Sequence, residues 1–140
     1  MTEEARHEES HATRPARPFL LMTLCVFALV FYGILGILLL AGTFYSGFFT
    51  DLLQGYNPGE SIGKPLVILF FLGLALPHWA SFTGALLIWK LKRKGYFLFA
   101  FSTLLIAVFH LFLPDISILV TTIHISLIIL FGLFYNFYQL

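Results

Sequence analysis

Four long apolar stretches dominate this chain, and a short basic cluster separates the second from the third. Each stretch holds roughly twenty residues, the length that an α-helix needs to cross the hydrocarbon core of a bilayer. None of them contains Asp, Glu, Lys or Arg. Closed barrels are excluded, because the stretches are continuous and do not alternate between apolar and polar residues. We therefore predict an all-α, polytopic membrane protein built as a bundle of four transmembrane helices.

Length and composition fit a single membrane domain. Of the 140 residues only 11% are charged, against about 25% in an ordinary soluble domain. Residues 1–18 are polar and lack apolar periodicity, so we expect a disordered cytoplasmic tail. Its His7 and His11 lie among solvated charges, and we do not expect them to bind a metal. The predicted parts are the tail over 1–18 and a membrane domain over 19–140, with helices at 19–45, 65–89, 96–113 and 116–138.

The distribution of basic residues predicts the orientation. Four of the eight Lys and Arg residues lie in the cluster between the second and third helices. They are Lys90, Lys92, Arg93 and Lys94. Adding the three arginines of the tail leaves only Lys64 on the opposite side, and positive residues favour the cytoplasm. We predict that both termini are cytoplasmic and that the loop over 46–64 faces outward. The lipid bilayer is the expected partner, and nucleic acid is not, because the flanks of the cluster are apolar.

Small residues and a proline predict where the helices meet. The second half of the first helix carries Gly33, Gly36, Ala41 and Gly42. Small residues let helices approach closely in lipid, so this surface is a predicted packing face. In the second helix, Gly73 and Gly84 share a narrow face with Pro77 and predict a second close contact. Pro77 also removes a backbone donor from the middle of that helix, and we predict a hinge there.

Three histidines interrupt the hydrophobic pattern inside the predicted spans. An ionisable group within a membrane is a functional hypothesis by default. Helix positions place His78 and His124 near the midplane, where the two rings could face each other, and His110 nearer the outer surface, too far for easy convergence with His78. All three share a helix face with small or hydroxyl residues. The candidate polar site consists of His78, Ser81, Thr103, His110, Thr121 and His124.

Three classes of function fit these features. With no soluble domain attached, the chain is expected to be a non-catalytic accessory, scaffold or assembly subunit, bound to a membrane-protein partner or to copies of itself. The first alternative is a small oligomeric transporter or proton path through His78, His110 and His124. The second is a membrane anchor for haem b ligated by His78 and His124, although cations for the propionates are distant.

Enzyme chemistry, a cofactor and a metal site are not expected. Cys25 is the single cysteine, which excludes an internal disulfide and a CxxC redox pair. Beyond the tail, the acidic residues Asp51, Glu60 and Asp115 lie at the outer edge, away from the midplane histidines. No carboxylate can therefore help to neutralise a divalent cation at the midplane. The segment GALLIWKLKRKGYF is common in kind among small bacterial membrane proteins, so we expect a multi-pass protein of a bacterial inner membrane.

Overall fold

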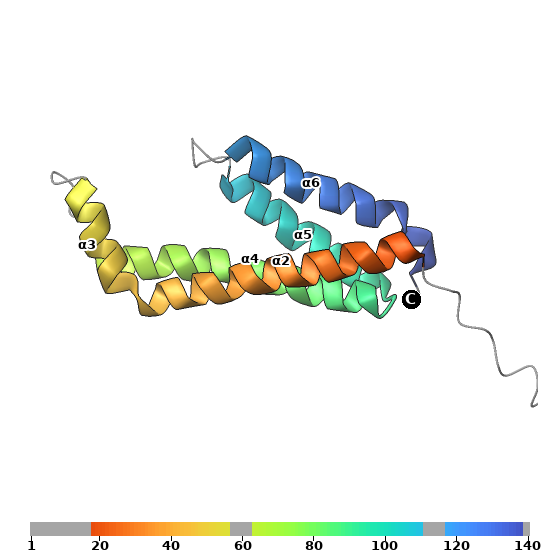
Figure 1. The fold of residues 1–140 in the computed structure, drawn as a ribbon, viewed down its shortest axis with the longest axis horizontal. Coiled ribbons are helices and arrows are strands. Elements are labelled where there is room, and N and C mark those ends of the chain that lie inside the picture. The colour runs from red at the N-terminus through yellow and green to blue at the C-terminus, as the bar shows by residue number, and fades with distance from the viewer. Residues whose placement is uncertain (1–17, 57–62, 111–116, 139–140) are drawn as a thin grey trace, which may run out of the picture.

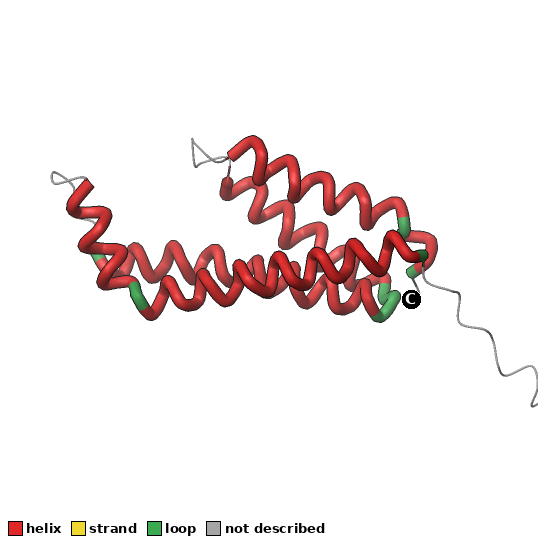
Figure 2. The backbone as a smooth tube through the Cα atoms, viewed as in Figure 1, coloured by secondary structure: helices red, strands yellow, loops and turns green. Residues whose placement is uncertain are grey.

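The computed structural model is all-α over the residues that it describes, which are 18–56, 63–110 and 117–138. Figure 2 shows helices joined by short loops, and these ranges contain no strand. The prediction of an all-α fold is therefore confirmed. The elements are α2 (Phe19–Phe44), α3 (Ser46–Tyr56), α4 (Lys64–Trp89), α5 (Arg93–His110), α6 (Ser117–Leu133) and the 3₁₀ turn η1 (Tyr135–Phe137).

Helix α4 is the centre of the bundle. It packs against α2 and against α5, whereas α6 packs mainly on α5 and touches α2 only marginally. Figure 1 shows α2 beside α4 along most of its length, while α5 and α6 diverge from this pair toward the end that carries α3. At the opposite end lie the start of α2, the turn between α4 and α5, and η1. We call the end that carries α3 the α3 end. The opposite end is called the basic end, after the basic residues of the α4–α5 turn.

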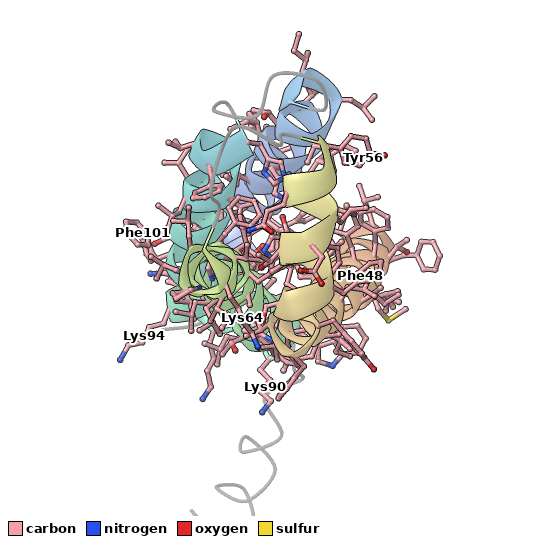
Figure 3. All side chains as sticks on the ribbon, turned by 90° about the vertical axis from the view of Figure 1, so that its left-hand side faces the viewer. Phe48, Tyr56, Lys64, Lys90, Lys94 and Phe101 are labelled. Carbon is pink, nitrogen blue, oxygen red and sulfur yellow. The ribbon has the colours of Figure 1, made fainter. Side chains whose placement is uncertain are left out.

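Two helices are long and apolar enough to cross a membrane, judged by length and composition alone. They are α2 and α4, each of 26 residues. Many large apolar side chains point outward from the bundle; Leu69 is 67% exposed and Phe101 is 72% exposed. In Figure 3, Phe101 projects away from the helices, as do the ammonium groups of Lys90 and Lys94. The exterior is therefore largely apolar, with Lys90 and Lys94 at the basic end and Lys64 at the α3 end.

Helix α3 lies within the stretch over 46–64 that was predicted to be a loop. The chain leaves α2 at Tyr45 and continues as an 11-residue helix. Phe49 anchors it, because its ring lies 4.9 Å from the ring of Phe71 on α4. The apolar residues recur at helical spacing, so one side of α3 can face α4. Residues 57–62 of the predicted loop lie outside the described residues.

The basic turn is tighter than the sequence suggested. Helix α5 begins at Arg93 instead of residue 96, because the chain reverses within Lys90–Lys92. Leu91 adopts a positive φ of 57°, a left-handed conformation that is unusual for a branched residue. Arg93 then donates from Nε to the carbonyl of Tyr138 at 3.0 Å. The start of α5 is thereby tied to the chain that follows η1.

Glycines bring the backbones of α4 and α5 into contact. A Cβ on Gly84 would lie 2.7 Å from the backbone nitrogen of Phe99, and one on Gly95 would lie 2.6 Å from that of Ile88. Only glycine fits at such distances. The close contact predicted for Gly84 is confirmed, but the prediction is wrong for Gly73, which is exposed with nothing within 4 Å of its added Cβ.

Aromatic rings of α4 pack against the small residues of α2. Added Cβ atoms on Gly36 and Gly42 would meet the rings of Trp79 and Phe71 at 3.1 and 2.5 Å. Gly33 is packed in the same way by Phe82, at 3.3 Å. The predicted packing face on α2 is therefore confirmed, and it is a contact within the chain.

We expect Gly84→Ala to destabilise the bundle by about 1–3 kcal/mol, because the new methyl group collides with the backbone of α5. Gly73→Ala is the matched control, since it makes the same change in the same helix where space is open. Unfolding by heat or denaturant in mild detergent measures the difference. Equal stability of the two variants would contradict the α4–α5 contact.

Candidate functional site

The three histidines on α4, α5 and α6 are anchored in the same way. Each Nδ1 lies within hydrogen-bond distance of the carbonyl four residues earlier: 2.7 Å from Leu74 for His78, 2.8 Å from Ile106 for His110, and 2.6 Å from Val120 for His124. A carbonyl oxygen only accepts, so Nδ1 carries the proton in all three rings. In a neutral imidazole the lone pair then lies on Nε2. Each ring therefore keeps Nε2 available as an acceptor or a ligand.

The rings meet in the interior, between all four long helices. The ring centres of His110 and His124 are 5.5 Å apart, with the planes inclined by 33°. The ring of Tyr32 on α2 packs against two of the histidines. Its centre is 5.9 Å from the ring centre of His78 and 5.7 Å from that of His124. We call His78, His110, His124 and Tyr32 the imidazole cluster. Tyr32 and His124 are fully buried, His78 is almost so, and His110 is partly exposed.

The contact between His110 and His124 was not predicted from the sequence. We predicted that His78 and His124 could face each other and that His110 lies too far outward for easy convergence with His78. A long side chain on a helix leans toward the N-terminus of that helix, and here the Nδ1 bonds hold the rings in that direction. Because α5 and α6 run antiparallel, His110 leans toward the basic end and His124 toward the α3 end. The two rings therefore converge.

Several polar atoms at the cluster lack a partner. Among the described residues, the buried side-chain polar atoms without a hydrogen bond are Tyr32 Oη, Trp79 Nε1, Thr121 Oγ1 and His124 Nε2. Thr121 lies one turn from His124 on α6, and Tyr32 lies near Thr103. A buried polar group without a partner costs about 1–3 kcal/mol. Of these atoms, Tyr32 Oη and His124 Nε2 belong to the imidazole cluster.

A chain of hydroxyl groups continues from the cluster toward the basic end. Ser81 Oγ lies 2.8 Å from Ser102 Oγ and 3.1 Å from Thr103 Oγ1. Ser102 also donates to the carbonyl of Leu98 at 2.7 Å. Ser102 Oγ also lies 3.2 Å from the carbonyl of Phe99. In each hydroxyl pair either oxygen can donate, so Ser81, Ser102 and Thr103 form one hydrogen-bonded network.

Aromatic and aliphatic side chains close the bundle beyond these hydroxyl groups. The rings of Phe99 and Phe131 pack edge to face with centres 4.8 Å apart, and both residues are fully buried, as is Ile88. Tyr138 donates its hydroxyl proton to the carbonyl of Phe131 at 2.7 Å. We call Ile88, Phe99 and Phe131 the apolar plug. It separates the polar groups from the basic end.

The structure brings most of the predicted polar residues together. His78, His110 and His124 share the imidazole cluster, and Ser81 and Thr103 share the hydroxyl chain. Thr121 contributes one of the unpartnered atoms. Pro77 is buried inside α4, which continues without a break through it, so the predicted hinge stays a prediction. The four residues that the sequence predicts to set the topology lie in the turn between α4 and α5 or at the start of α5, several helical turns from the cluster: Lys90, Lys92, Arg93 and Lys94.

Tyr32 and Ser102 were not among the predicted site residues. Tyr32 carries the only hydroxylated ring in the middle of the first apolar stretch, and that isolated polar group was a usable signal. Ser102 precedes Thr103 directly, so helical geometry alone does not indicate which of the two faces α4. Both in fact contact Ser81.

Haem does not fit the residues present. Bis-histidine ligation by His78 and His124 would need a porphyrin between them, but the fully buried Tyr32 ring lies against both. No group of three or more His, Cys, Asp or Glu side chains within 18–56, 63–110 and 117–138 is placed to hold a metal ion. The cluster therefore offers fewer than three nitrogen ligands to a metal ion.

We expect Ser81→Ala to cost about 0.6–2 kcal/mol of stability, since it removes the hydroxyl group that hydrogen-bonds with both Ser102 and Thr103 in the interior. Thr83→Ala is the control on the same helix, because Thr83 is exposed and bonds only to the carbonyl of Trp79. Unfolding in mild detergent compares the two variants. A smaller loss for Ser81→Ala than for Thr83→Ala would show that the hydroxyl chain contributes nothing.

No protein-family model, no curated protein and no solved structure matches this chain.

Proposed function

We propose that this chain spans a membrane four times, with both termini and the α4–α5 turn on the cytoplasmic side. Three features support this. The start of α2, the basic turn and η1 lie at one end of the bundle, as an even number of spans requires. Lys90, Lys92, Arg93 and Lys94 lie at that end, and Lys64 begins α4 at the other. Helix α5, with 18 residues, is about 27 Å long, close to the thickness of the hydrocarbon core.

On this topology the α3 end faces outward, and the function that fits best is proton transport through the imidazole cluster. The observation that carries the proposal is the shared anchoring of the three rings, which leaves each Nε2 lone pair free to accept a proton. His110 is partly exposed near the outer end of α5, so it provides entry. His124, Tyr32 and His78 then lead inward to the hydroxyl chain.

The mechanism that we propose is a carrier mechanism instead of a continuous proton wire. A wire through imidazole needs a proton to enter at one ring nitrogen and leave from the other. Here Nδ1–H is bound to a carbonyl that has no proton to give, so each ring must accept and release at Nε2. The apolar plug also separates the cluster from the cytoplasmic end. Release inward therefore requires the helices to rearrange around the plug.

An accessory or assembly role stays a prediction of the sequence. Its histidines would only join helices, and such a role needs no unpartnered ring nitrogen in the interior. Three ionisable rings without any charged residue to compensate them are costly in a membrane, and such groups mark transport paths. This cost favours transport over a passive scaffold.

The topology predicts opposite accessibility for two exposed positions. A cysteine at Gly55, in the outward α3, should react with a membrane-impermeant maleimide in intact cells. A cysteine at Lys92 should react only after the membrane is permeabilised. Native Cys25 is buried at 1% exposure and gives little background. Labelling of both positions from the same side would contradict four spans.

Proton transport predicts that His124→Ala slows proton entry into proteoliposomes by at least about tenfold, because the ring that joins His110 to Tyr32 is lost. A trapped pH-sensitive dye measures entry after an imposed pH step. Thr122→Ala is the matched control, since Thr122 is exposed on the same helix and bonds only to the carbonyl of Ile118. Unchanged flux in His124→Ala, or equal loss in both variants, would refute the proposal.

A further inference from the structure

We propose that the groove between α3 and α4 binds an acyl chain of an anionic phospholipid, whose phosphate pairs with Lys64. The groove has a volume of about 430 Å³, within the range of about 300–1,000 Å³ that ligand pockets occupy. The residues that line it are all apolar and come from both helices: Leu52, Leu53, Leu66, Val67 and Phe70, with the contacting rings of Phe49 and Phe71. We call it the α3–α4 groove.

The groove lies at the depth where acyl chains begin. Lys64 is the first residue of α4, which is one of the two helices long and apolar enough to cross a membrane. From Lys64 to Phe71 the helix rises by about 10 Å, so the groove follows directly below the level of the lipid headgroups. This step rests on the membrane crossing proposed above, and it does not require proton transport.

Helix α3 has the features of a helix that lies in the membrane interface. It turns away from the direction of α2 and runs across this end of the bundle (Figure 1, Figure 3). Aromatic side chains are exposed at both of its ends: Phe44 and Tyr45 where the chain leaves α2, and Tyr56 at its last residue. Tyrosine is enriched at the interface, and an amphipathic helix there turns its apolar side toward the acyl chains. The α3–α4 groove is on that apolar side.

Charge selects the lipid. Lys64 is exposed and precedes Val67 and Phe71 by one and two helical turns, which places it on the side of α4 that carries the groove. Asp51 is the only acidic residue within 18–56, 63–110 and 117–138, and it lies two residues from Leu53, on the opposite side of α3. Lys64 therefore favours a headgroup with a net negative charge over a zwitterionic one.

A second copy of the chain fits the groove less well than a lipid. In a two-fold dimer the same patch meets itself, so two Lys64 residues would be brought to one interface. Like charges placed together at an interface repel each other. A phospholipid instead fills the apolar lining with its chain and supplies the opposite charge on its own headgroup.

The test is photo-crosslinking of the full chain in vesicles of equal parts phosphatidylglycerol and phosphatidylcholine. In separate samples, a trace of one or the other lipid carries the same diazirine on its acyl chain, and peptide mass spectrometry identifies the labelled residues. We expect phosphatidylglycerol to label Leu53, Leu66 and Phe70 about fivefold more than phosphatidylcholine does. Leu104 and Leu105 are the internal control, because they are exposed on α5, which does not line the groove, and both lipids should label them equally.

Two substitutions examine the charge. Lys64→Gln should make the two lipids label the groove equally, without changing the labelling of α5. Lys90→Gln is the matched control, since it makes the same change just after the other end of α4, and it should keep the preference. A preference that survives Lys64→Gln would overturn the lipid site.

Two further substitutions examine the groove itself. Leu53→Trp fills it with a larger side chain and should reduce the labelling of Leu66 and Phe70 by both lipids. Phe48→Trp is the control on the same helix, because Phe48 is exposed and does not line the groove. Equal labelling of Leu66 and Phe70 in the two variants would also overturn the site.

The labelling of α5 separates this proposal from the proposed function. If both lipids label Leu104 and Leu105 but the groove shows no preference, only the lipid site fails. If neither lipid labels Leu104 and Leu105, the membrane crossing fails with it. Proton flux is measured separately, so a preference for phosphatidylglycerol without flux would support the lipid site and refute only proton transport.

Discussion

The close contact between α4 and α5 is the constraint on which the rest of the structure depends. Gly84 and Gly95 let the two backbones touch, at distances where any side chain would collide. This contact brings Ser81 within hydrogen-bond distance of Ser102 and Thr103. In lipid no hydrophobic force draws helices together, so close packing and interhelical hydrogen bonds are the available sources of stability. Helix α6 then packs on α5, and this placement brings His124 to His110.

The imidazole cluster follows from a second constraint, the direction in which side chains lean. Each ring is held over the preceding turn of its own helix by its Nδ1–H. Because α5 is antiparallel to α6, the rings of His110 and His124 approach from opposite directions. The same bonds fix the tautomer of all three rings. Position and chemistry of the cluster therefore have one physical origin, the hydrogen bond from a side chain to the carbonyl four residues earlier.

The interior has a polar part and an apolar part. The cluster and the hydroxyl chain fill the part toward the α3 end, and Ile88, Phe99 and Phe131 fill the part toward the basic end. Hydrogen bonds link this apolar part to the basic end, because Tyr138 donates its hydroxyl proton to the carbonyl of Phe131 and accepts from Arg93 at its own carbonyl.

The sequence alone determined the helical class and the identity of most polar residues in the interior. Charge-free apolar stretches can satisfy their backbone groups in lipid only as helices, and His78, His110 and His124 stand out against them. It also indicated the small-residue face of α2 and the close contact at Gly84. Only the tertiary structure decided that His124 meets His110, that Tyr32 joins them, and that Gly73 contacts nothing. Those outcomes depend on the direction of antiparallel neighbours and on rotamers fixed by hydrogen bonds, neither of which residue spacing along one helix encodes.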